Sequence, residues 1–247
     1  MEKYGATRDE MSYPDWSRRL AQAERESRAG KTITLAKAPG YGIAAKKPYY
    51  VLNLLEEIDR PGEWYLDRAA AILYLWPPEG FERGEVLLST LRAPLVSLKD
   101  TAFLRLEGLT LEMGTDNGVE ISGHDNLITN SIIRNMRKDG VIVSGDRNGV
   151  AHCEISGIGE AGVSLTGGDR HKLVAGEDFV RNCRIHDFGR WERTYAPAVR
   201  INGVGQIVAN NLLYDAPHSA ILFGGNDHRI ELNEIHNVCL ESNDAGA

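Results

Sequence analysis

A short motif recurs along the second half of this chain: a Gly or Ala, four residues in which apolar side chains recur, and a closing Gly. The copies begin 22, 22, 36 and 22 residues apart, so one repeat carries 14 extra residues. A fixed period in this range is typical of stacked coils. The five copies are Gly118–Gly123, Gly140–Gly145, Gly162–Gly167, Ala198–Gly203 and Ala220–Gly225.

Each repeat carries further apolar runs after the motif. A second run is seen at Leu127-Ile128, and a third follows a small polar residue, as in Ser131–Ile133 and Cys153–Ile155. Three short β-branched runs, each closed by Gly, Asn or Asp, predict three strands per coil. The predicted fold is therefore all-β, a right-handed parallel β-helix of about 22 residues per coil. A leucine-rich repeat has a similar period, but it needs a leucine-dominated consensus and a helical segment in each unit.

Stacking also predicts where individual side chains lie. Alternation turns Val119 and Ile121 inward and the residues between them outward. Residues at one repeat position form columns along the stack, so Cys153 and Cys183 are expected as neighbouring, small, buried side chains. Asparagines before the third strands are expected to hydrogen-bond from coil to coil at the strand spacing of ~4.8 Å. These asparagines are Asn130, Asn182 and Asn210.

The first third of the chain lacks the repeat. Residues 1–85 are expected to form a flanking α+β segment, and residues 86–247 the β-helix, which starts with apolar runs at 86–89 and 94–97. Within the flanking segment, the pattern predicts a helix in 18–28, a strand at 32–35, and a β-hairpin. The hairpin joins Glu63–Asp67 to Ile72–Trp76. Its aromatic residues are expected to form a local core rather than a sugar-stacking surface, because large aromatics supply most of a small core's buried area.

Charge and composition narrow the range of partners. The net charge is −7 and there is no basic tract, which argues against nucleic acid and anionic membrane surfaces. No run approaches the length of a membrane span, and the N-terminus has no signal h-region. We expect no cofactor and no metal, because the sequence has neither zinc-type cysteine spacing nor a phosphate-binding or dinucleotide fingerprint.

The 14 extra residues of the long repeat fall in two places. About eight lie between Gly167 and Cys183, and about six lie between Cys183 and Ala198. The second insertion, His186–Pro197, is rich in aromatic and charged residues and includes Trp191 and Tyr195. Loops carried on a rigid scaffold are where binding and catalytic residues concentrate, so these two aromatics are candidate substrate contacts.

The column two places before the first strands carries candidates for proton transfer. It places His218 next to Asp244 on the following coil, with Glu241 close in sequence. A His beside a carboxylate can titrate near neutrality, although turn residues solvated at a coil edge give the same pattern. Arg200 and Asn202 point outward from a first strand and are candidate contacts for sugar hydroxyls or carboxylates. Asp215, in a turn, is a further candidate.

Several segments resemble bacterial right-handed β-helix proteins of polysaccharide breakdown, and glycoside hydrolase family 141 is the nearest named group. The segments are Pro61–Arg68, Asn182–Phe188, Arg193–Pro197, Asp215–His228 and Glu241–Ala247. The resemblance implies a carboxylate pair as acid and as nucleophile or base, acting on a plant or algal polysaccharide or oligosaccharide. It implies Asp244 as one of the pair, with its partner on later coils. Similar proteins are longer and secreted or periplasmic, so we expect this chain to be a fragment.

Two other functions fit the same fold, because parallel β-helices serve several purposes. A polysaccharide lyase or epimerase would need a uronic-acid substrate, a basic residue such as Arg200, and in many cases Ca²⁺. A non-catalytic carbohydrate-binding solenoid would bind sugars without turnover.

Overall fold

The computed structural model describes residues 53–84, 87–242 and 245–247. The chain divides into two compact units between Leu87 and Leu88. The helix expected in 18–28 and the strand expected at 32–35 lie outside the described residues, as does Asp244.

The described part of the first unit is built around the predicted hairpin. β1 (Trp64–Asp67) pairs antiparallel with β2 (Ile72–Leu75), and the single-turn 3₁₀ helices η1 (Leu55–Glu57) and η2 (Phe81–Arg83) flank it. The rings of Tyr65 and Tyr74 pack across the two strands with centroids 5.9 Å apart. The expected aromatic core is only partly confirmed, because Trp64 is 53% exposed and Trp76 and Tyr74 are exposed as well. A two-stranded ribbon cannot bury both of its faces.

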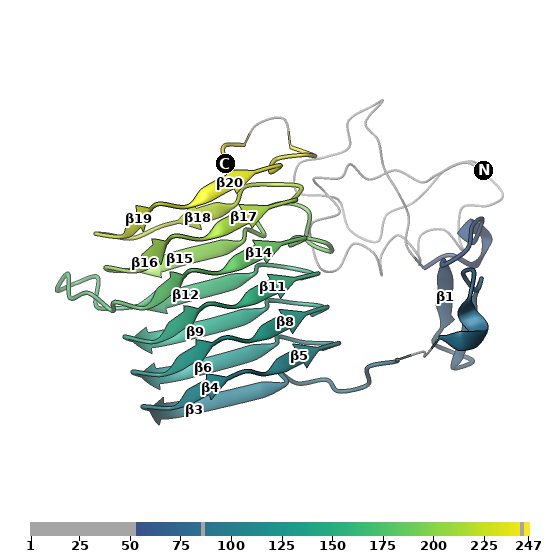
Figure 1. The fold of residues 1–247 in the computed structure, drawn as a ribbon, viewed down its shortest axis with the longest axis horizontal. Helices are drawn as coiled ribbons and strands as arrows, with labels where there is room; N and C mark the ends of the chain where they lie inside the picture. Colours follow the sequence, from purple (N-terminus) through teal and green to yellow (C-terminus); the bar gives the residue numbers. More distant parts are fainter. Residues whose placement is uncertain (1–52, 85–86, 243–244) are drawn as a thin grey trace. The chain divides into compact units, whose positions relative to one another are not determined.

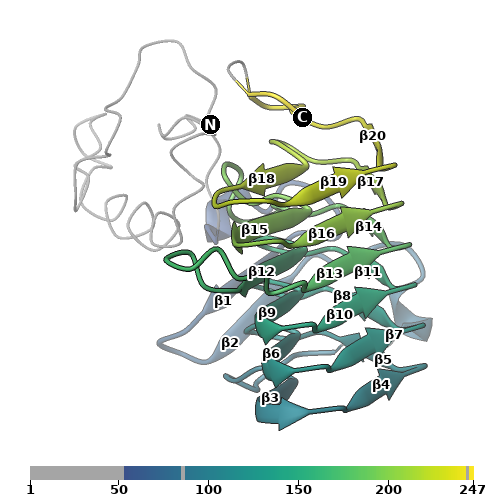
Figure 2. The ribbon, with the colours of Figure 1, turned by 90° about the vertical axis from the view of Figure 1, so that its left-hand side faces the viewer.

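The second unit is a parallel β-helix of six coils (Figure 1). Each coil contributes one strand to each of three six-stranded sheets, and equivalent strands of successive coils pair in parallel. The register is regular except between β3 and β6, where it shifts between Leu98 and Thr101. In the view of Figure 2 the first and second sheets run side by side up the stack. The leucine-rich alternative is excluded, because all three sides of the described coils are strands.

The first sheet holds β3 (Val96–Ala102), β6 (Val119–His124), β9 (Val141–Asp146), β12 (Val163–Gly167), β15 (Val199–Gly203) and β18 (Ile221–Phe223). The second sheet holds β4 (Arg105–Glu107), β7 (Leu127–Thr129), β10 (Gly149–Ala151), β13 (Phe179–Arg181), β16 (Ile207–Ala209) and β19 (Arg229–Glu231). The third sheet holds β5 (Thr110–Glu112), β8 (Ile132–Arg134), β11 (Glu154–Ser156), β14 (Arg184–His186), β17 (Leu212–Tyr214) and β20 (Glu234–His236). The described residues of the run expected at 86–89 do not form a strand. The first strand of the β-helix is β3, which begins at Val96.

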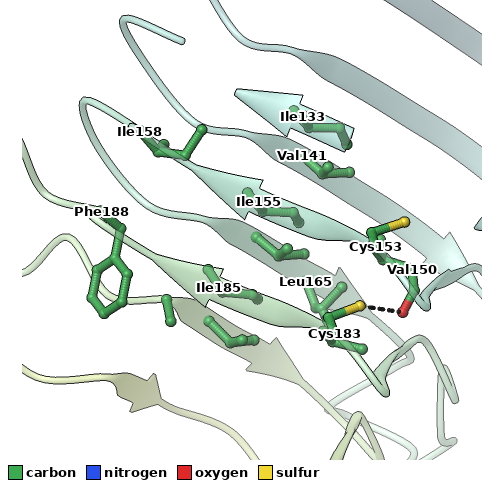
Figure 3. Close-up of a cluster of buried hydrophobic side chains, with 14 of the residues drawn as sticks. Ile133, Val141, Val150, Cys153, Ile155, Ile158, Leu165, Cys183, Ile185 and Phe188 are labelled. Atoms are coloured by element: carbon green, nitrogen blue, oxygen red, sulfur yellow. Dashed lines mark hydrogen bonds between the residues drawn. The ribbon is translucent and has the colours of Figure 1, made fainter. Parts of the chain in front are cut away.

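The core is a set of columns of β-branched side chains along the coil axis. Val119 and Ile121 are buried, as alternation predicts, and so are the central residues of most second and third strands. Figure 3 shows Ile133, Ile155 and Ile185 stacked in one such column, with Cys153 and Cys183 beside it. Both cysteines are free thiols, and the Cys183 Sγ lies 3.6 Å from the carbonyl of Val150. They therefore serve as small core residues, as expected.

The closing glycines of the motif have a steric cause. At Gly145 the backbone φ is 127°, and a β-carbon there would lie 1.9 Å from the carbonyl oxygen of Gly123 in the preceding coil. A side chain at this position would force the two coils apart, because the contact is with backbone. This explains why the repeated motif closes with glycine in each copy.

Polar ladders run along two edges of the stack. The expected amide bond links Asn210 to Asn182, whereas Asn130 donates to Glu107. A buried ladder not anticipated from the sequence lies between the first and second sheets. It begins with Asn126, whose Nδ2 donates to Asn148 Oδ1 at 2.9 Å, and continues through Asp178 and Gln206. The side chains of Asn126, Asn148 and Asp178 are joined by hydrogen bonds in this way because each has a counterpart one strand spacing away.

Both insertions lie where the sequence indicates. The first, residues 168–178, leaves the stack between β12 and β13, and the second, residues 187–198, joins β14 to β15. We call the second insertion the 187–198 loop.

Candidate active site

The 187–198 loop folds back onto the turn of the preceding coil. Phe188 anchors its start in the core, and backbone hydrogen bonds then attach it to residues 158–160. The amides of Trp191 and Glu192 both donate to the carbonyl of Gly159, at 2.8 and 3.0 Å. A β-carbon on Gly159 would lie 2.8 Å from Cδ1 of Trp191 in the loop and 1.9 Å from the carbonyl oxygen of Arg137 in the preceding coil, so only glycine fits between them. The loop therefore holds Glu192 beside Glu160.

Three acidic residues gather under this loop, and we call Asp139, Glu160 and Glu192 the carboxylate cluster. Asp139 is the most buried of them. Its Oδ1 accepts from the amide of Ala161 at 2.9 Å, and its Oδ2 accepts from the hydroxyl of Ser164 at 2.8 Å. Burial nevertheless raises its pKa, because these donors only partly replace the lost hydration.

The other two members of the cluster also have raised pKa values. Burial raises the pKa of Glu160, and the negative charge of Asp139 adds to the effect. For Glu192, burial and then the charge of Glu160 raise the pKa to about 7. Like charges held close together cannot both ionise easily, so Glu192 keeps part of its proton population near neutral pH.

Arg200 connects the cluster to the loop. Its Nη1 lies 3.7 Å from Asp139 Oδ2 and 3.4 Å from Ser164 Oγ, and its Nη2 donates to the carbonyl of Tyr195 at 2.8 Å. Its positive charge lowers the pKa of each of the three carboxyl groups, although by less than burial raises it. The sequence analysis predicted Arg200 as an outward-facing binding residue, and the structure finds it partly buried among these groups.

Two exposed aromatic rings flank the cluster on the same loop. Trp191 is 42% exposed and Tyr195 is 56% exposed. The ring of Tyr195 lies 5.1 Å from the ring of His218, which is buried. Of the predicted site residues, Arg200, Trp191, Tyr195 and His218 are thus brought together around the 187–198 loop.

Glu241 also reaches this loop, through an ion pair. Its carboxylate binds Arg193 with two hydrogen bonds, at 2.9 Å to Nε and 2.5 Å to Nη2. The amide of Glu241 donates to the carbonyl of Pro217 at 3.0 Å, which fixes the segment carrying it next to His218. The expected pairing of His218 with Asp244 falls outside the described residues.

The two other predicted contact residues lie at the margins. Asn202 is exposed on the outer face of the first sheet, in register with Thr166 of the preceding coil. Asp215 starts the turn after β17 with a φ of 56°, and its Oδ1 accepts from the amide of Asn237 at 3.2 Å. Asp215 is therefore a turn residue, linked to Asn237 at the equivalent position of the next coil.

Sequence reasoning missed all three members of the carboxylate cluster as site residues. Glu160 lies in the column two places before the first strands, but it was not selected as a candidate. Glu192 lies in an irregular loop, where spacing gives no register, and its position depends on the contact with Gly159. A partial signal was the density of charged and aromatic residues in the loop itself.

The described ranges were also compared with the requirements of a metal site and of a membrane-spanning helix. Residues 53–84, 87–242 and 245–247 contain no group of three or more His, Cys, Asp or Glu side chains arranged to hold a metal ion. Nor does any helix in these ranges have the length and apolar character needed to cross a membrane.

Comparison with known proteins gives one family. The sequence model of the right-handed β-helix region matches residues 96–190 and 117–246, which together cover more than half of the chain. Neither the search of curated proteins nor the search of solved structures returned a match. The matched region coincides with the six coils described above, and its family defines the hand of the coil. The chain therefore belongs to the family of right-handed parallel β-helix proteins.

Proposed function

We propose that this β-helix belongs to a glycoside hydrolase acting on a plant or algal polysaccharide, with Glu192 as the general acid. The observation that carries the proposal is the raised pKa of Glu192, about 7, next to Glu160. Glycosidases need one carboxyl group that keeps its proton at working pH and a second that is ionised. Glu192, which keeps its proton to about pH 7, and the neighbouring Glu160 meet this need.

Within the cluster the three acids take different roles. Glu192 holds the proton, and Glu160 is its ionised partner, as base or nucleophile. Asp139 is buried, and its carboxylate accepts hydrogen bonds from Ser164 and Ala161. It therefore acts as a positioning residue for Arg200. Trp191 and Tyr195 offer exposed aromatic faces beside the cluster, and such faces pack on pyranose rings.

The remaining predicted site residues support this arrangement in different ways. Glu241 binds Arg193 and so holds the 187–198 loop, which is a positioning role rather than a free carboxylate. His218 packs under Tyr195. Asp244 keeps the role that the family resemblance implies, as a further carboxylate of the site. Under this proposal the parent protein is secreted or periplasmic, where polysaccharides are found.

The lyase alternative is less well supported. A lyase of this fold would need a basic side chain free to remove a proton, and Arg200 is the candidate. Its guanidinium is instead engaged by Asp139, Ser164 and the carbonyl of Tyr195.

The test compares the protein with Glu192→Gln on a panel of neutral and acidic plant and algal polysaccharides, with release of reducing ends as the readout. Loss of a general acid is expected to lower the rate by about 10²- to 10⁴-fold. Glu234→Gln, an exposed glutamate on the third sheet, is the matched control and should retain full activity. Unsaturated, UV-absorbing products would establish a lyase, and binding without turnover would establish a binding solenoid. Either result contradicts the proposal.

A further inference from the structure

A concave surface lies away from the carboxylate cluster, on the outer face of the second sheet. It is an open groove of about 480 Å³ over β7, β10 and β13. We call it the second-sheet groove. Its lining brings together Arg181, His152, Asn130 and Asn182, and it includes no acidic side chain. A positively charged, donor-rich groove is unexpected on a chain with a net charge of −7.

The shape of the groove depends on two small residues of β10. Gly149 and Ala151 of β10 lie between larger residues on the neighbouring coils, Leu127 and Thr129 on one side and Phe179 and Arg181 on the other. The ring of Phe179 covers Gly149 so closely that a β-carbon there would lie 2.1 Å from the ring. The aromatic ring therefore fills the place of the missing side chain, and this lays Phe179 along the sheet.

The cation in the groove is held in place without being neutralised. The guanidinium of Arg181 lies 4.9 Å from the centroid of the Phe179 ring, a cation–π contact. Its Nε is buried and has no hydrogen-bond partner among the described residues. By contrast, Arg105 at the edge of the groove is bound by Glu107 at 2.7 Å. An arginine held in one orientation over an aromatic ring is suited to an oxyanion, because its fork of donors matches two oxygens.

Neutral donors line one side of the groove. Asn130, His152 and Asn182 occupy one turn position on three successive coils, all with positive φ, so their side chains form a row. The amide of Asn182 lies 3.5 Å from His152 Nε2, and Asn130 donates to Glu107 at 2.8 Å. Amide and imidazole groups spaced one coil apart can bind successive hydroxyl groups of an extended ligand.

We propose that the second-sheet groove binds an acidic oligosaccharide, with Arg181 bound to a carboxylate or sulfate oxygen of the sugar and the row of Asn130, His152 and Asn182 bound to its hydroxyls. The groove is open and shallow, which suits a chain lying along the coils better than an enclosed small molecule. The inference goes beyond the proposed hydrolase because it concerns a different sheet. It holds or fails whether or not Glu192 is catalytic.

The test measures binding by calorimetry with three tetrasaccharides: one bearing carboxylates, one bearing sulfate esters, and a neutral one. We expect at least one acidic tetrasaccharide to bind, at least 10-fold more tightly than the neutral one, with affinity that falls as salt rises. The acidic sugar that binds identifies the anion. Arg181→Gln should weaken this binding at least 10-fold, and Arg181→Lys should restore part of it.

Matched variants separate this groove from other surfaces. Arg170→Gln removes the same charge from an exposed position in the first insertion and should change the affinity less than twofold. The loss of affinity caused by Arg181→Gln should be the same in a Glu192→Gln background, since the carboxylate cluster is on another face. His152→Asn, which keeps a residue tolerant of positive φ, should weaken binding in a folded protein. The proposal is overturned if no acidic sugar binds, if the neutral sugar binds equally well, or if Arg181→Gln binds like the unmodified protein.

Discussion

The ring of Trp191 lies against Gly159, so that a β-carbon added to the glycine would be 2.8 Å from the Cδ1 atom of the indole. The carbonyl oxygen of the same glycine accepts hydrogen bonds from the amides of Trp191 and Glu192. The position of the proposed acid therefore depends on one residue having no side chain. The stability of the loop and the chemistry of the cluster are linked at this contact.

Gly159→Ala should displace the 187–198 loop, because the new methyl group would meet the indole Cδ1 of Trp191 at 2.8 Å on the loop side and the carbonyl oxygen of Arg137 at 1.9 Å on the side of the preceding coil. We expect a loss of about 1–3 kcal/mol in the free energy of unfolding, measured in urea. Gly224→Ala is the control, since a β-carbon there would meet only the side-chain oxygen of Asn202, at 3.3 Å. Equal stability of the two variants would show that the close approach at Gly159 does not constrain the loop.

The ion pair between Arg193 and Glu241 should stabilise the loop as a unit. Both side chains are mostly buried, at 21% and 12% exposure, so removal of one leaves the other poorly solvated. Glu241→Gln and Arg193→Gln should each destabilise the protein, and the double variant should lose less than the sum of the two. The expected coupling is about 0.5–3 kcal/mol in a double-mutant cycle. Strict additivity would contradict the positioning role of Glu241.

Asp178 should make stability depend on pH. It is fully buried, its Oδ1 accepts two hydrogen bonds from Asn148, and its Oδ2 has no partner among the described residues. Burial raises its pKa to about 7. In the unfolded chain this carboxyl group loses its proton above about pH 4, whereas in the folded protein it keeps the proton to about pH 7. Its contribution to stability is therefore complete below pH 4 and is lost as pH rises toward 7.

Asp178→Asn tests this directly, because the amide carries a permanent donor where the acid needs a proton. The neighbouring Gln206 has a buried Oε1 that accepts no hydrogen bond from the described residues, and an amide or a protonated acid on the adjacent coil can supply one. From pH 5 to pH 7 the unmodified protein should lose on the order of 2 kcal/mol relative to the variant, at about 1.4 kcal/mol per pKa unit. Parallel pH profiles for the two proteins would show that Asp178 is ionised throughout.

Arg200→Gln should raise the pKa of Glu192 further, because the positive charge of Arg200 lowers it at present. If Glu192 is the general acid, the alkaline limb of the activity profile should move to higher pH in this variant. A shift to lower pH, or none, would mean that Arg200 and Glu192 do not interact.

The repeat predicted the fold in detail because residues at one position of each coil share one environment. Val119, Ile155 and Ile201 face the same core, so their pattern is readable without the structure. The strand Phe179–Arg181 was missed, since the insertion before it breaks the spacing that identified its equivalents. The groove around Arg181 was missed for the same reason.

The candidate site was predicted in part. Arg200, Trp191, Tyr195 and His218 were singled out from the strand pattern and the loop composition, and they lie together. Asp139 and Glu192 were missed because their raised pKa values arise from burial under a folded loop. No spacing rule reports how an irregular loop packs against the preceding coil.

The most direct test of the central claim is the carboxyl ¹³C NMR titration of Glu192, assigned by comparison with Glu192→Gln. It needs no knowledge of the substrate. The account predicts a titration near pH 7, so that the residue is largely protonated at pH 6 and can donate a proton. A titration near the ordinary glutamate value of about 4.3 would contradict it, since Glu192 would then be ionised at neutral pH and could not serve as the acid.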